Sequence, residues 1–156
     1  MSPTTANTWQ FTEHTRETQE SFTYDDMINA YLKGKEEATK ENLAAIKKLL
    51  LDNLKKAGEQ TSEIITELKN KDIEVRSALL KIHNWNEVEV LLIVPQDNYI
   101  DPHFLEAYDL ITKFEKEFYE EEIYSITFSF VDDNDYLDKD KIESDGFILE
   151  HKMNQS

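Results

Sequence analysis

The chain has 156 residues, which is enough for one well-cored domain with an appendage and too few for two ordinary domains. Its 33 acidic residues outnumber 17 Lys and Arg, and the resulting net charge of -16 disfavours direct binding to nucleic acid or to an anionic membrane. The absence of Cys excludes disulfides and thiolate zinc sites. No apolar run approaches the roughly 18 residues of a membrane helix, and the N-terminus lacks a secretory pattern. The sequence therefore predicts a cytoplasmic protein.

Residues 1–21 are polar and rich in Thr. Such a segment buries too little apolar surface to offset the entropy lost on ordering, so it is predicted to be a flexible arm. Trp9 and Phe11 are its large aromatic side chains and are candidates for binding a partner or a neighbouring subunit. The alternative, in which both pack against their own domain, is equally compatible with the sequence.

Residues 22–71 are predicted to be helical. Thr23, followed by Asp25 and Asp26, is a helix start signal. Gly58 is expected to interrupt the helical pattern, and a further helix is expected to end near Lys71. The alternative is one unbroken helix over residues 24–70, which would be about 70 Å long.

An apolar stripe at helical spacing runs along this region and gives an amphipathic helix with one dry face. So much apolar surface ahead of a small sheet favours a homo-oligomer, while the alternative is a set of helices folded back on the sheet. The residues expected to mediate association are Leu43, Ile46, Leu50 and Leu54.

Residues 72–152 are predicted to form an α+β domain. Residues 74–95 contain two strands joined by a polar turn, and the second strand is continuously apolar, as in a strand covered on both faces. Asp101 and Pro102 begin a helix that runs to about Glu121. Strands are expected at 122–131 and 147–151, which gives a mixed four-stranded sheet (β-β-α-β-β) covered by helices. The intervening helix is a crossover, so the second and third strands should be parallel.

Glu87 and Glu89 stand at the head of the central apolar strand. Two carboxylates two residues apart on a strand point to the same face and can hold a divalent cation. The helix, strand and turn before this acidic-x-acidic strand, its continuation LLIVP, and the later crossover helix and strand DGFILEHK resemble the minimal nucleotidyltransferase family over residues 60–152. That resemblance implies Mg-nucleotide binding at Glu87 and Glu89.

The family's motifs are not reproduced. Its Gly-Ser pair would fall at residues 82–84, which are Ile, His and Asn, its paired acids are Asp rather than Glu, and no acid occurs at 125–129, where its third carboxylate is expected. The resemblance therefore implies a degenerate, inactive relative.

The acidic loop that follows the third predicted strand matches an EF-hand calcium loop in part. Its position 6, which requires Gly, is occupied by Leu137, and a strand rather than a helix precedes it. Positions 1, 3, 7, 9 and 12 are Asp132, Asn134, Asp138, Asp140 and Glu143.

No two of the four His residues stand at a zinc-ligand spacing, and the three Gly residues form no phosphate-binding loop. The sequence therefore favours a non-catalytic protein that binds a protein partner, as an inhibitor, an antitoxin-like partner or a subunit of an assembly. We expect no resident cofactor, with Mg²⁺ at Glu87 and Glu89 and Ca²⁺ at the acidic loop as candidate ions. The same acidic groups are the expected contacts for a basic partner, and the alternative function is the nucleotide binding implied by the resemblance.

Overall fold

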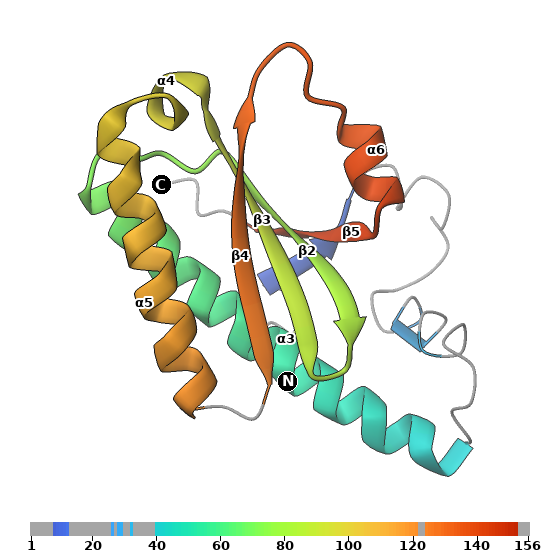
Figure 1. Cartoon of the computed structure of the whole chain (residues 1–156). Helices are drawn as coiled ribbons and strands as arrows, with labels where there is room; N and C mark the ends of the chain where they lie inside the picture. Colours follow the sequence, from blue (N-terminus) through green and yellow to red (C-terminus); the bar gives the residue numbers. More distant parts are fainter. Residues whose placement is uncertain are drawn as a thin grey trace.

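The computed structural model describes residues 8–12, 26, 28–29, 32, 40–121 and 124–152. Within them, five strands form one mixed sheet in the order β1-β5-β2-β3-β4 (Figure 1). The strands are β1 (Trp9–Phe11), β2 (Ser77–Asn84), β3 (Glu87–Pro95), β4 (Ser125–Asp133) and β5 (Phe147–His151). The helices are α3 (Lys40–Asn70), α4 (Gln96–Tyr99), η2 (Pro102–Phe104), α5 (Leu105–Glu121) and α6 (Lys139–Ser144).

The α+β class and the central topology are confirmed. β2 and β3 form an antiparallel hairpin, and β3 pairs with β4 in parallel from Glu87 and Ser125 to Pro95 and Asp133. The parallel pairing follows from α5, because two parallel neighbours require a crossover between them. As predicted, Asp101 caps the start of this region by accepting a hydrogen bond from the backbone N–H of His103.

The four-stranded sheet was a wrong prediction, because Trp9–Phe11 form a fifth strand that pairs antiparallel with β5. These residues lie within the segment predicted to be a flexible arm. The structure thus supports the alternative for Trp9 and Phe11: their side chains are 1% and 5% exposed in the core of their own chain. The rest of the predicted arm, apart from Thr8 and Thr12, lies outside the described residues.

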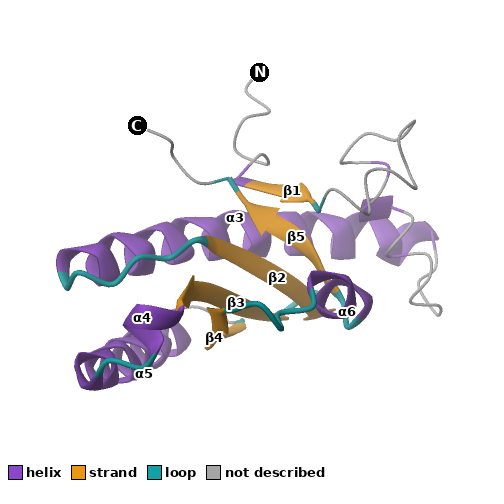
Figure 2. Cartoon of the chain, turned by 90° about the horizontal axis from the view of Figure 1, so that it is seen from above, coloured by secondary structure: helices purple, strands orange, loops and turns teal. Residues whose placement is uncertain are grey.

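The predicted break at Gly58 is also wrong, because α3 continues through it as one helix of 31 residues. Figure 2 shows that this helix is longer than the strands it accompanies. Gly58 instead lies in close contact with Thr8, because a Cβ atom built at Gly58 would lie 2.3 Å from Cγ2 of Thr8. The glycine lets the segment that leads into β1 run directly against the helix.

One face of the sheet carries buried side chains in register across its strands. Leu80 of β2 lies opposite Val90 of β3 and Leu149 of β5, and Val90 lies opposite Phe128 of β4. α3 crosses behind this face and α5 runs beside β4 (Figure 1). The indole Nε1 of Trp9 donates to the carbonyl oxygen of Leu54 at 2.9 Å, which joins β1 to α3. The core therefore lies between the sheet and these two helices.

The opposite face mixes apolar and charged side chains. Leu79 and Ile93 are buried there, while Lys81 and Glu89, which pair across β2 and β3, are partly exposed. Gly146, just after α6, packs against the Lys81 side chain, so the chain around α6 covers part of this face. Among the described helices, none combines the length and the apolar character needed to cross a membrane.

Substitution of Gly58 by Ala should destabilise the protein, although Ala is favoured over Gly by about 1 kcal/mol in an ordinary helix interior. The added Cβ would collide with both Cγ2 and Cβ of Thr8, at 2.3 and 2.7 Å. Urea denaturation should give a lower midpoint for Gly58→Ala. Gly58→Ala should cost less unfolding free energy in a Thr8→Gly background than in the wild type, because the colliding atoms are then gone. An equal cost in both backgrounds would contradict the proposed contact.

Leu50 and Leu49 offer a matched pair of truncations on α3, because Leu50 is fully buried and Leu49 is 40% exposed. Leu50→Ala should cost about 2–5 kcal/mol of unfolding free energy, whereas Leu49→Ala should change it by less than about 0.5 kcal/mol. Denaturation at two protein concentrations tests whether Leu50 acts within the core of a single chain. If Leu50 stabilised an oligomer instead of the core, its midpoint would depend on protein concentration.

Candidate functional site

Glu87 and Glu89 lie on the sheet face opposite the core, as their spacing predicted. Oε1 of Glu89 is 2.9 Å from Nε2 of His83, and Lys81 lies opposite Glu89 in the register of β2 and β3. The parallel partners on β4 are Ser125 and Thr127. The neighbouring strands therefore supply an imidazole, an ammonium and two hydroxyls, while the third carboxylate expected in the nucleotidyltransferase family is absent at residues 125–129.

The predicted calcium loop folds as the end of a strand, a turn and a short helix. The side chain of Asp138 caps α6 by accepting from the N–H of Lys141, and Asp140 and Glu143 lie within that helix. Asp132 accepts from the Asn134 side chain, and Glu143 accepts from the Thr12 hydroxyl. Throughout the described ranges, no group of three or more His, Asp or Glu residues is placed to hold a metal ion. The loop thus does not have the arrangement of an EF-hand.

The same loop instead borders an open hollow of about 430 Å³, which we call the acidic hollow. It begins where β4 ends, beside the carboxyl end of its parallel neighbour β3. Residues 132–145 contain seven carboxylates and two lysines, so its surroundings are strongly negative. Arg76 contacts Asp133 at 3.1 Å on one side. The residues that line the hollow are Asp133, Asn134, Leu137, Asp138, Lys139 and Asp140.

Most of the described residues of the predicted association stripe are buried in the core. Leu50 and Leu54 are 0% and 2% exposed, and Ile46 packs against the core cluster in a partly buried position. The side chain of Leu43 lies outside the described residues. The alternative of helices folded back on the sheet therefore accounts for Leu50 and Leu54, while association stays a prediction.

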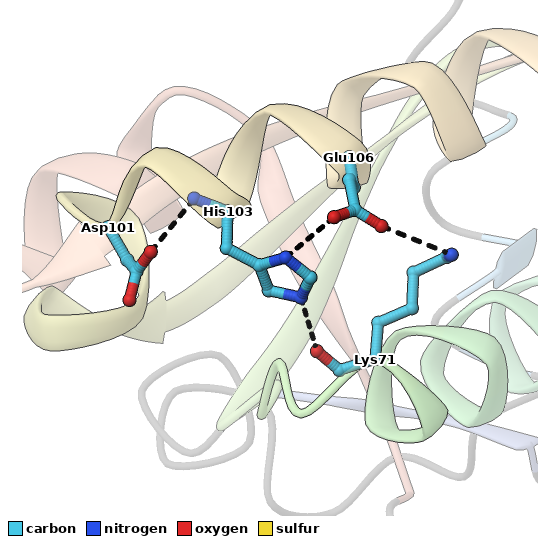
Figure 3. Close-up of polar contacts among 4 residues, drawn as sticks. All are labelled: Lys71, Asp101, His103 and Glu106. Atoms are coloured by element: carbon cyan, nitrogen blue, oxygen red, sulfur yellow. Dashed lines mark hydrogen bonds and ion pairs between the residues drawn. The ribbon is translucent and has the colours of Figure 1, made fainter.

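A polar cluster that the sequence did not predict joins the end of α3 to the start of α5 (Figure 3). Nε2 of His103 lies 2.9 Å from the carbonyl oxygen of Lys71, and its Nδ1 lies 2.6 Å from Glu106. Glu106 also contacts the Lys71 ammonium at 3.5 Å. The hydrogen bond to the Lys71 carbonyl, followed by the charge of Glu106, raises the pKa of His103. This geometry favours imidazolium and fastens two helices.

His151 forms a second contact between distant elements. Its Nε2 lies 3.0 Å from the Ser62 hydroxyl and 3.3 Å from the carbonyl oxygen of Gly58, and its ring meets Trp9 edge-on at 5.2 Å. When Nε2 carries the proton, both the Ser62 hydroxyl and the Gly58 carbonyl can accept from it. Nδ1 is buried without a hydrogen-bond partner in the described part of the chain. His151 thus joins β5 to α3 and to Trp9 of β1.

No protein-family model matches the chain, and comparisons with curated proteins and with solved structures find no match. The nucleotidyltransferase resemblance therefore stays a prediction. The network around His103 and the contact of His151 escaped sequence reasoning because each joins residues that are far apart in the chain, with backbone carbonyls as partners.

His151 should make the fold sensitive to mild acid. Burial lowers its pKa below the ordinary value of 6.5, while the Gly58 hydrogen bond opposes the shift. Below about pH 6.5 the unfolded chain therefore binds a proton that the folded chain does not, and stability falls by up to about 1.4 kcal/mol per pH unit. Between pH 7 and 5, the unfolding free energy of His151→Asn should depend less on pH than that of the wild type, whatever the absolute stability of the variant.

His103→Asn is the matched control, because the pKa of His103 is raised and its contribution has the opposite sign. That contribution is fully present below about pH 6.5 and is lost as the pH rises through the higher pKa of the folded state. The variant should therefore lose stability between pH 7 and 5 at least as steeply as the wild type. Equal pH profiles for wild type and His151→Asn would contradict the assignment.

Proposed function

We propose that the protein is a non-catalytic binding protein whose acidic hollow receives a basic segment of a partner protein. The observation that carries the proposal is the concentration of seven carboxylates in residues 132–145, around an open hollow of about 430 Å³. Complementary charge steers a basic partner towards such a surface and disfavours acidic competitors. The net charge of -16 extends the same field over the whole molecule.

The position of the hollow supports the proposal independently of its charge. It lies beyond the carboxyl ends of two parallel strands, β3 and β4, where loops gather and where ligands of parallel sheets commonly bind. Leu137 contributes an apolar side chain to the lining, so the hollow offers contact area as well as charge. A binding surface of this kind needs no catalytic group.

The three histidines in the described part of the chain have structural partners. His83 contacts Glu89, His103 contacts Lys71 and Glu106, and Nε2 of His151 lies against Gly58. These contacts favour binding over catalysis as the proposed role. Self-association through the stripe around Leu50 loses its main support, because that side chain is buried in its own chain.

The proposal can be tested with the untagged chain, its host extract and native mass spectrometry. The wild type should be recovered in complex with a basic polypeptide. Asp135→Asn/Asp140→Asn should weaken that complex by about two- to tenfold, because each exposed charge pair contributes modestly. Both carboxylates are exposed beside the hollow, and neither caps α6.

Glu59→Gln/Glu63→Gln is the matched control, since it removes the same charge from exposed positions on α3. It should bind like the wild type. Recovery of the chain without any bound polypeptide, or equal weakening by both double variants, would show that the acidic hollow is not a specific binding surface.

A further inference from the structure

β4 is the last strand in the sheet order, so one of its edges has no neighbouring strand among the described residues. Figure 1 shows β4 in front of the other strands, with α5 alongside. The backbone N–H of Phe128 points out of this edge and donates to Oε2 of Glu115 on α5 at 2.7 Å. In a parallel ladder alternate residues direct both backbone groups to the same side. Ile126 and Phe130 therefore turn their N–H and C=O groups outward together with Phe128.

Glu115 occupies the place that a carbonyl oxygen of a further strand would take. Such a charged side chain over an edge blocks unwanted pairing between sheets. Burial raises the pKa of Glu115, and the hydrogen bond from Phe128 lowers it in part. The carboxylate is therefore held at a half-buried position by one backbone donor, and a ligand that takes over this donor must give Glu115 another partner.

The helix beside this edge exposes a row of side chains that are apolar apart from Glu115. Leu105, Tyr108, Glu115 and Tyr119 follow one another at intervals of three, seven and four residues, which places them on one helix face. Leu105 is 68%, Tyr108 44% and Tyr119 72% exposed. The ring centroids of Tyr108 and of Phe130 on β4 lie 5.4 Å apart, so this face borders the open edge. Together, the outward groups of β4 and this row define the edge surface.

We propose that an extended segment of a partner protein binds at the edge surface as an additional strand next to β4, with a Lys or Arg facing Glu115. Its carbonyl accepts from the Phe128 N–H, its cation pairs with the released carboxylate, and its apolar side chains contact the exposed row on α5. This inference rests on the proposed function and deepens it, because the edge of β4 leads directly to the acidic hollow at Asp133.

The charge of Glu115 also selects among possible occupants. Two copies of the chain paired through β4 would bring together two Glu115 carboxylates and two chains of net charge -16, which disfavours self-pairing. A basic segment supplies a cation for Glu115 and is attracted by the net charge of -16. The occupant that fits is therefore a basic, extended segment of a different protein.

The experiment selects peptides from a phage-displayed library of random 16-residue sequences against the whole folded chain. The selected peptides should alternate apolar residues with a Lys or Arg at a fixed position. Glu115→Gln should weaken them by about tenfold, because the amide still accepts from Phe128 but no longer pairs with a cation. Glu115→Lys should favour acidic peptides instead. Glu117→Gln removes the same charge from the same helix but from another face, and should bind as the wild type does.

Amide hydrogen exchange, measured by NMR, locates the bound peptide. Ile126, Phe128 and Phe130 should gain protection, since their outward N–H groups become part of a ladder. A library that yields no binder, or equal effects of Glu115→Gln and Glu117→Gln, would overturn the proposed strand addition. Protection confined to residues 133–140 would overturn it as well, while leaving the acidic hollow as a binding surface.

Discussion

The parallel pairing of β3 with β4 is the constraint on which the rest of the structure depends. Parallel neighbours cannot be joined by a tight turn, so α5 must cross over between them, and it comes to lie beside β4. The same pairing brings the carboxyl ends of both strands together, where the chain leaves β4 into the acidic loop. The acidic hollow and the edge surface are thus two consequences of one topological choice.

α3 is the second determinant, because it holds elements from both ends of the described chain. Trp9 of β1 donates to Leu54, and His151 of β5 lies against Ser62 and Gly58 on the same helix. The missing side chain at Gly58 permits the close approach of Thr8, which precedes β1. Leu50 and Leu54, which the sequence suggests as part of an association surface, are therefore buried in the chain's own core.

The elements that could be predicted from the sequence are those with a local signal. The continuous apolar run of β3, the alternation in β2 and the Asp101–Pro102 helix start identified the central hairpin and the crossover. β1 was missed because it has three residues and depends on pairing with β5, about 140 positions away. Gly58 was misread because a glycine needed for close contact and one that ends a helix look alike in sequence.

The candidate sites were less predictable because the chemical role of each residue depends on side chains that are distant in the chain. Glu87 and Glu89 share a face as expected, but His83 and Lys81 change the chemistry of that face. The loop acids have a suggestive spacing, yet Asp138 caps a helix and Glu143 binds Thr12. Spacing along a chain shows which groups can share a face, whereas the charges that meet them are fixed only by the register between strands.

Glu115 illustrates how one carboxylate can serve both solubility and recognition. An open strand edge in a protein with exposed aromatic side chains would invite nonspecific pairing, and an acceptor already bonded to the edge N–H prevents it. Because that acceptor is half-buried and charged, only a strand that brings a cation can displace it without leaving the carboxylate unpaired. The blocking group is therefore also a specificity filter, and its sign matches the acidic hollow at the end of the same strand.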